Sequence, residues 1–140
     1  MRLWHKDLIS ILPKQQLCGQ WRECCLIAKQ ISEKGIPNHI LVNKIMNYSI
    51  DHFITYSWMI KEEMCYRGYK CDWQKFINHF IYNFKWKTID EKELFKDWHN
   101  SRYLNQCYCN LEEKYDCGGI PQIEWNNLYY HYWRMKKEMD

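Results

Sequence analysis

An Arg–Glu pair lies near the centre of a segment that has the pattern of a helix, QLCGQWRECCLIAKQI, residues 16–31. Carboxylates such as that of Glu23 are common proton-transfer groups in enzymes, so Arg22 and Glu23 could be the working pair of an active site. At 100° per residue, Arg22 lies about 140° from Leu17 and Glu23 about 120° away on the other side, whereas Trp21 stays near Leu17. Both charges therefore face away from the apolar stripe, and geometry alone favours a solvated helix face.

Cysteine and histidine side chains are the other candidates for chemistry. Cys107, Cys109 and Cys117 have a C-x-C-x7-C spacing, but a zinc site takes four ligands, often in C-x2–4-C pairs. Free thiols are favoured here, and we expect no metal and no other cofactor. His39 and His99 lie beside breaks between helical patterns, where each could orient a substrate or transfer a proton. A hydrogen-bonded structural histidine is an equal alternative for each.

The elements that must position these residues are predicted to be helices. The first 12 residues lack a clean period and indicate an ordered arm. An apolar stripe at spacings of 3 and 4 predicts a helix from Pro13 to a C-cap at Gly35. The short apolar segment HILVNKIMN, residues 39–47, could be a helical turn or a strand. A second helix is expected from a cap at Ser49 to Gly68.

Three further helical patterns complete the chain. One follows Asp72 and carries apolar residues as far as Phe84. Another starts at DEKE, where Asp90 and Glu93 have the spacing of a capping box, and breaks near Asn100 before continuing to the GG at residues 118–119. The tail is aromatic and then charged. We expect a compact all-α single domain, residues 1–140, built as a helical bundle with the N-terminal arm packed against the first helix.

Composition narrows the class of protein. The 140 residues are 46% hydrophobic and 17% aromatic, which indicates a folded chain, and the net charge of +3 permits a polyanionic partner without requiring one. No apolar run approaches the roughly 18 residues of a membrane span. The N-terminus lacks the apolar region of a signal peptide, so we expect a cytoplasmic protein whose eight cysteines are reduced.

The N-terminal segment MRLWHKDLISILPKQQLCGQWRECC resembles the start of the pyrimidine-dimer DNA glycosylase family, the endonuclease V type first known from bacteriophage. Arg2, the QL at residues 16–17 and the WRE at residues 21–23 follow in the family's order. Weaker likenesses are EEMCYRGYK at residues 62–70, LEEKY at residues 111–115 and the aromatic YYHYW of the tail. The likeness places the chain closest to a bacterial branch of the family.

The resemblance implies a chemistry and a set of residues. The family attacks C1′ of the damaged nucleotide with its N-terminal amine, forms a Schiff base and cleaves the strand by β-elimination. An α-amine, with a pKa near 7.7–8.0, is partly unprotonated at neutral pH. The matching residues here are Glu23, which stabilises the sugar cation and moves protons, and Arg22 and Arg2, which hold phosphates. DNA would lie across the basic arm and the first helix, which adds Lys6, Lys14, Gln15, Lys29 and the third-helix Lys114 as contacts.

The sequence departs from the family at three places. Its second residue is Arg instead of a small residue, so Met1 is expected to be retained and its α-amine to be the nucleophile. The family's third-helix basic residue is matched by Asn110. The region 38–62 is shorter than in the phage enzyme.

The leading interpretation is a metal-free, monomeric DNA repair glycosylase with AP-lyase activity, acting on double-stranded DNA that contains a damaged pyrimidine or an abasic site. It would use Met1, Glu23 and Arg22, with His39 or His99 orienting the substrate. One alternative is a non-catalytic nucleic-acid or nucleotide-binding protein that retains the fold. Another is a cysteine-rich metal or redox module.

Overall fold

A computed structural model describes residues 1–80 and 85–139, and in these ranges it contains helices and no strand. An extended arm, residues 1–5, opens the chain. The elements that follow are the 3-10 helix η1 (Lys6–Ile11), α1 (Lys14–Lys34), the 3-10 helix η2 (Asn43–Asn47), α2 (Ile50–Tyr66), α3 (Trp73–Ile77), α4 (Ser101–Asp116) and α5 (Gln122–Met139). The expected all-α architecture is confirmed.

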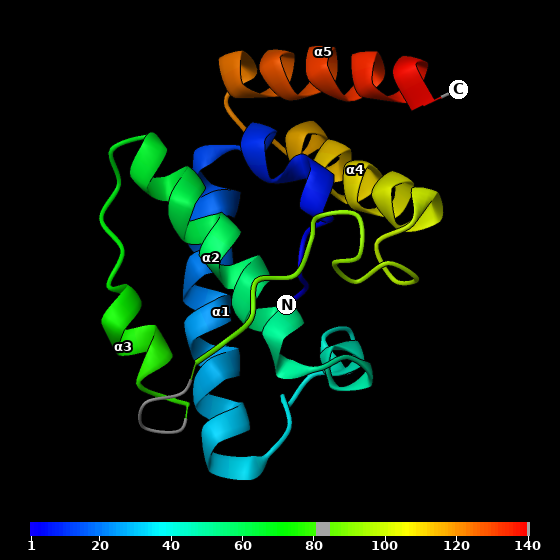
Figure 1. The fold of residues 1–140 in the computed structure, drawn as a ribbon. Helices are drawn as coiled ribbons and strands as arrows, with labels where there is room; N and C mark the ends of the chain where they lie inside the picture. Colours follow the sequence, from blue (N-terminus) through cyan, green and yellow to red (C-terminus); the bar gives the residue numbers. More distant parts are fainter. Residues whose placement is uncertain (81–84, 140) are drawn as a thin grey trace.

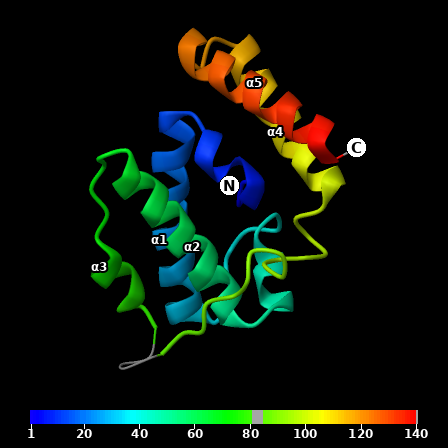
Figure 2. The ribbon, with the colours of Figure 1, turned by 45° about the horizontal axis from the view of Figure 1, so that its top comes forward.

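The helices form two packed groups (Figures 1 and 2). α1 and α2 lie side by side with α3 beside them, and α4 and α5 form a second pair at one end of the molecule. None of the helices in the described residues is both long enough and apolar enough to cross a membrane.

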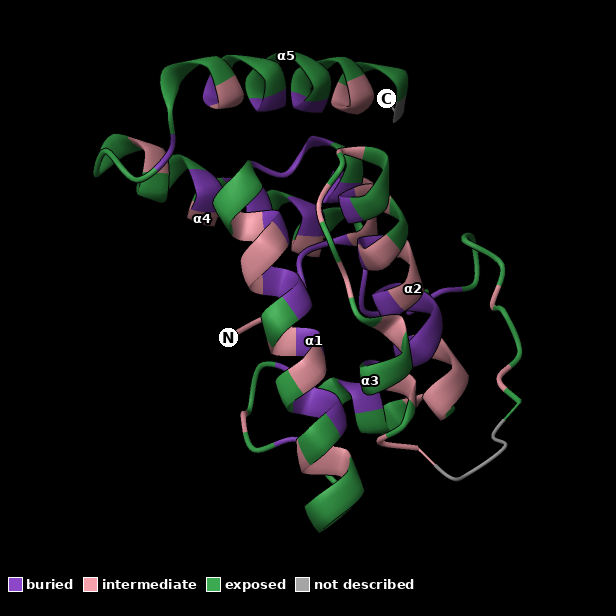
Figure 3. Cartoon of the chain, turned by 90° about the vertical axis from the view of Figure 1, so that its left-hand side faces the viewer, coloured by how far each residue is buried: buried purple, intermediate pink, exposed green. Residues whose placement is uncertain are grey.

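Helix α1 begins and ends where its sequence indicates. Pro13 precedes its first residue, and Gly35 ends it with a φ of 80° and an N–H that donates to Ile31 O. Burial alternates along α1, as the colours of Figure 3 show, and the buried residues include Leu17 and Trp21. This stripe packs against α2 and, through Trp21, against α3, which holds the helix in place.

The second and third helical patterns are confirmed in part. Ser49 precedes α2, which ends before Gly68. Asp72 caps α3 by accepting a hydrogen bond from Lys75 N at 3.0 Å. The pattern after Asp72 also extended through Ile81 and Phe84, which lie outside the described residues. The segment HILVNKIMN contains η2, so it is a helical turn and not a strand.

The prediction of a helix that begins at Asp90 is wrong. Residues 91–98 form successive turns, and α4 begins only at Ser101, capped by the side chain of Asn100. Asp90 Oδ1 accepts from Lys92 N instead of closing a capping box, and Phe95 N donates to His52 Nδ1 on α2. Phe95 adopts a φ of 48°. The left-handed backbone of Phe95 and its hydrogen bond to α2 therefore interrupt the regular helical ladder that the local sequence favours.

Stacked tyrosines join α5 to α4. The rings of Tyr108 and Tyr132 lie parallel with centroids 3.8 Å apart, and those of Tyr115 and Trp125 stack at 4.6 Å. These contacts bury part of the aromatic tail in the α4–α5 interface. Tyr129, Tyr130 and Trp133 remain about half exposed.

The arm is buried although it has no regular structure. Leu3, Trp4 and His5 are 0, 6 and 2% exposed. Their backbone groups bond to side chains from several elements, which is how a buried irregular segment satisfies its polar atoms. The N-terminus consequently lies beside α1, as Figures 1 and 3 both show.

Candidate active site

The start of the arm lies against the half-buried carboxylate of Glu23 on α1. The backbone N–H of Arg2 donates to Glu23 Oε2 at 3.4 Å. Met1, one residue before it, packs partly buried against the core. The structure thus brings Arg2, the residue after Met1, to Glu23, which lies 21 positions further along the chain.

Gln20, which is not part of the QL or WRE motifs, fixes this arrangement. Its Nε2 donates to Arg2 O at 2.9 Å and to Glu23 Oε2 at 3.3 Å, and its Oε1 accepts from Trp4 N at 2.7 Å. The side chain is almost completely buried. A polar residue about 60° from Leu17, on the apolar side of the helix, was a signal that could have identified it.

Tyr56 on α2 supports the same network from behind. Its hydroxyl lies 2.6 Å from Trp4 O and 2.9 Å from Gln20 Oε1. Burial raises the pKa of Tyr56 well above its usual value of 10, so the hydroxyl keeps its proton and donates it. The arm is therefore tied to α1 and α2 through one continuous set of hydrogen bonds.

Arg22 lies exposed on the outer side of α1. A Cβ built on Gly19 would lie 3.7 Å from Arg22 Nη2, so the guanidinium folds back along the helix. The guanidinium of Arg2 lies 5.3 Å from the ring centroid of Trp4. Within the described residues the exposed guanidinium of Arg22 forms no ion pair, so it can meet an anion from solvent.

A cavity of about 490 Å³ adjoins the arm and contains Arg2 in its wall. The α1–α2 connection contributes one side, and Trp98 and α4 contribute the other. It is lined by Arg2, Ile40, Leu41, Lys44, Trp98, Tyr103, Gln106 and Asn110. This set holds two cations and no carboxylate, a composition suited to an anionic partner.

Lys6 and Lys14 have partners of their own. The ammonium of Lys6 donates to Leu94 O at 2.7 Å and to Glu91 O, and burial lowers its pKa. The ammonium of Lys14 lies 5.3 Å from the ring centroid of Tyr69. The ammonium of Lys6 therefore binds the turns of residues 91–98 and is not part of the network around Glu23. DNA contact by these two residues stays a prediction.

The remaining basic and polar candidates lie on exposed helix surfaces. Gln15 and Lys29 are exposed on the same helix as Glu23, and Lys114 is exposed near the end of α4. Gln15, Arg22 and Lys29 recur every seven residues, so they form one row along α1. That row suits a partner lying along the helix.

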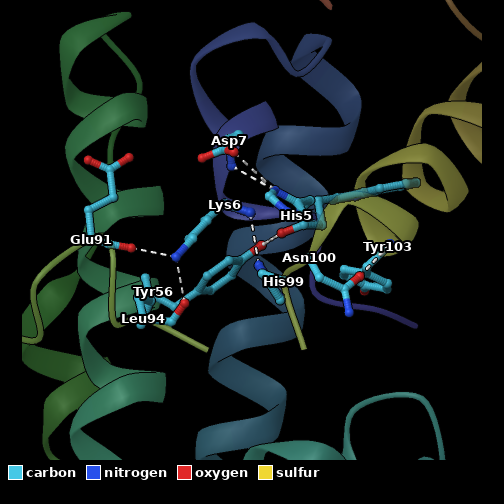
Figure 4. Close-up of polar contacts among 10 residues, drawn as sticks. His5, Lys6, Asp7, Tyr56, Glu91, Leu94, His99, Asn100 and Tyr103 are labelled. Atoms are coloured by element: carbon cyan, nitrogen blue, oxygen red, sulfur yellow. Dashed lines mark hydrogen bonds and ion pairs between the residues drawn. The ribbon is translucent and has the colours of Figure 1, made fainter. Parts of the chain in front are cut away.

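His99 holds the arm instead of facing solvent. Its Nδ1 accepts from Lys6 N at 3.0 Å, and its ring stacks on His5 with centroids 5.0 Å apart (Figure 4). Burial lowers the pKa of His99 to about 2, so the ring is neutral and its proton is on Nε2. Within the described residues that buried Nε2 has no hydrogen-bond partner. This environment suits a structural histidine.

His39 shapes the connection between α1 and α2. Its Nδ1 accepts from Leu41 N at 3.2 Å, and its carbonyl accepts from Val42 N and Asn43 N. These contacts are local to the turn. A substrate-orienting role for His39 stays a prediction.

The cysteines do not gather into a metal-binding group in residues 1–80 and 85–139, where no three His, Cys, Asp or Glu side chains are placed to hold an ion. All eight are free thiols. Cys107 is buried, and its burial raises its pKa, whereas Cys109 and Cys117 are exposed. The three cysteines of the C-x-C-x7-C pattern therefore do not share one environment, since one thiol is buried and two are exposed.

Comparison with known proteins finds a family match for the N-terminal half of the chain. The family model described as pyrimidine dimer DNA glycosylase matches residues 1–76. This range covers the arm, η1, α1, η2, α2 and all but the last residue of α3, and it contains Arg2, Gln20 and Glu23. No curated protein and no solved structure matches the chain.

Proposed function

Because the chain belongs to the pyrimidine dimer DNA glycosylase family, we propose that it is a DNA repair glycosylase with AP-lyase activity that uses its N-terminal amine as the nucleophile. The observation that carries this proposal is the 3.4 Å contact between Arg2 N and Glu23 Oε2. It holds the first residues of the chain at a carboxylate, and Gln20 and Tyr56 fix them there.

The α-amine of Met1 attacks C1′ of the damaged nucleotide, and the glycosidic bond breaks as the base leaves with a proton. Opening of the sugar ring then gives an imine between the amine nitrogen and C1′. Loss of a proton from C2′ drives cleavage of the C3′–O bond, which breaks the strand. An α-amine suits the attack because its usual pKa, near 7.7–8.0, leaves a fraction unprotonated at neutral pH without burial.

Glu23 has two roles in this mechanism. Its carboxylate stabilises the positive charge that develops on the sugar while the base leaves. It also accepts and returns protons during ring opening and elimination. Gln20 supports both roles by donating to Oε2, which fixes the direction of the carboxylate.

The partner is double-stranded DNA carrying a damaged pyrimidine or an abasic site, bound by a monomer of this chain. Arg2 and Lys44 supply positive charge in the wall of the cavity beside the arm, and the exposed Arg22 precedes Glu23 on α1. A different cavity, of about 670 Å³, has four carboxylates in its lining, Asp7, Glu62, Glu63 and Glu91. Phosphates favour the first surface and are repelled by the second.

Borohydride trapping tests the mechanism directly. Untagged protein is mixed with a duplex containing one abasic site, and reduction should give a covalent adduct whose peptide mass places the DNA on Met1. Acetylating the N-terminus should abolish the adduct. A protein that binds this DNA in a salt-dependent way but forms no adduct would be a binding module, and the proposed chemistry would be wrong.

The role of Glu23 is tested by Glu23→Gln. This variant should bind the abasic duplex and still be trapped, yet lose at least about 100-fold in turnover, because the charge that stabilises the transition state is gone. Glu33→Gln, at an exposed position near the end of the same helix, is the matched control and should turn over normally. Normal turnover by Glu23→Gln would contradict the assignment.

A further inference from the structure

Two apolar side chains project from the tip of the α1–α2 connection. Ile40 is 81% exposed and Leu41 is 48% exposed. Neighbouring apolar side chains left in water are costly, and they commonly mark a surface that binds a partner. Ile36 and Met46, in the same connection, are also about half exposed.

The tip is held in a fixed shape. Val42 and Ile45 are fully buried and anchor it to the core. His39 accepts from Leu41 N through Nδ1, and the Asn43 side-chain amide lies 2.8 Å from Pro37 O and 2.9 Å from His39 O, bonding both through its nitrogen. A tip that is ordered before binding loses little conformational entropy when a partner covers it.

The tip lies beside the proposed active site. Ile40, Leu41 and Lys44 line the same cavity as Arg2, whose N–H contacts Glu23. The rest of the lining includes Gln106 and Asn110 of α4, whose side-chain amides can form hydrogen bonds with bases, whereas Trp98 is almost completely buried. The apolar tip therefore lines a cavity that also contains two cations and two side-chain amides.

We propose that Ile40 and Leu41 form a wedge that enters the base stack of duplex DNA next to the damaged nucleotide. This inference rests on the proposed function. Apolar side chains inserted between base steps unstack them and kink the duplex. The wedge buries its two side chains against bases, while Arg2 and Lys44 hold the flanking phosphates. Opening the stack exposes C1′ to the terminal amine, which a regular duplex would shield.

The test compares duplex with single-stranded DNA, because only the duplex has a stack to open. The double variant Ile40→Ser/Leu41→Ser is measured by borohydride trapping on an abasic-site oligonucleotide, alone and paired with its complement. The ratio of the duplex to the single-strand trapping rate should fall by about tenfold or more. Ile123→Ser, on the 82% exposed Ile123 of α5, is the matched control and should keep the wild-type ratio.

A second readout detects the unstacking itself. With 2-aminopurine next to the abasic site, wild-type protein should raise the fluorescence of the duplex, and the double variant should lose most of that rise. An unchanged rise, an unchanged ratio, or an equal loss on both DNAs would overturn the wedge. If wild-type protein forms no adduct at all, the proposed function is wrong. The fluorescence measurement would still show whether Ile40 and Leu41 open the base stack.

Discussion

Gln20 is the side chain that joins the arm to the carboxylate of Glu23. Each polar atom of its amide has partners, with Nε2 toward Arg2 O and Glu23 Oε2 and Oε1 toward Trp4 N. Replacing the nitrogen by oxygen keeps the shape but removes both donors. The substitution therefore separates the electrostatic role of Gln20 from its packing.

Gln20→Glu should move the acid limb of the pH–rate profile to higher pH by about one unit. Two carboxyls at this site cannot both ionise easily, so the pKa of the pair rises, and the ionised form that catalysis requires is reached only at higher pH. Single-turnover rates between pH 4 and 8 measure the shift. Gln74→Glu, at an exposed position of α3, should leave the profile in place, and an unmoved acid limb in Gln20→Glu would remove Gln20 from the mechanism.

The neutral ring of His99 makes stability depend on pH. Its pKa is lowered from 6.5 to about 2 by burial, so between these values the unfolded chain binds a proton that the folded chain does not. The free energy of unfolding should therefore fall as the pH drops below 6.5, by up to about 1.4 kcal/mol per pH unit from this group. Burial also lowers the pKa values of His5 and His52, which adds in the same direction.

His99→Asn should flatten this dependence. Urea denaturation at pH 7.0 and pH 5.0 gives the difference in unfolding free energy for each protein, so a general loss of stability cancels. His131→Asn, at an exposed position on α5, should keep the wild-type difference. If His99→Asn retains it as well, His99 is not the titrating group.

Gly19 inside α1 and Gly35 at its C-terminal cap should respond to alanine with stability changes of opposite sign. Gly35 has a φ of 80° and open space around a Cβ, so Gly35→Ala should cost about 1 kcal/mol in conformational strain alone. Gly19 lies inside the helix, where a Cβ meets Arg22 Nη2 at an ordinary 3.7 Å, so Gly19→Ala should stabilise by about 0.5–1 kcal/mol. Thermal unfolding of the two variants measures both, and shifts of the same sign would contradict the helix boundaries.

Residues that start or end a helix through local contacts allowed the bounds of several helices to be predicted from the sequence. Pro13, Gly35, Ser49 and Asp72 act through neighbouring backbone, so the bounds of α1 and α2 and the start of α3 follow from the sequence. The turns of residues 91–98 could not be predicted, because their local backbone hydrogen bonds are joined by bonds to His52 of α2 and to the Lys6 side chain, which lie far away in the sequence.

The residues of the candidate site also differ in whether the sequence could predict them. Arg2, Arg22 and Glu23 were predictable from a motif, and Gln20 from its place on the apolar side of α1. Tyr56 and Tyr103 were not, because their contacts with the arm span 52 and 100 positions of the chain. Nothing local to either tyrosine indicates such a partner.

For the whole molecule, the segregation of charge predicts which surface meets DNA. The lining of one cavity contains Arg2 and Lys44 and no carboxylate. The lining of the cavity between η1 and α2 contains four carboxylates. Each phosphate contact that is lost should reduce the slope of log affinity against log salt concentration by about 0.9.

Lys44→Gln and Arg22→Gln should each show that reduction. Titrations of an abasic duplex at several salt concentrations give the slope. Lys92→Gln is the matched control, since Lys92 lines a cavity together with Asp7, Asp90 and Glu91. An unchanged slope for Lys44→Gln, or an equal reduction for Lys92→Gln, would place the DNA elsewhere.

The clamping of the arm by distant residues also sets an order of events during synthesis. The first residues leave the ribosome first, but Leu3 O is held by Tyr103 and Lys6 N by His99. These partners lie beyond residue 76, where the family match ends, so the arm completes its docking only after α4 has been translated. Contacts across about a hundred residues form slowly compared with a helix. The newborn chain therefore acquires its helices early and its reactive end last.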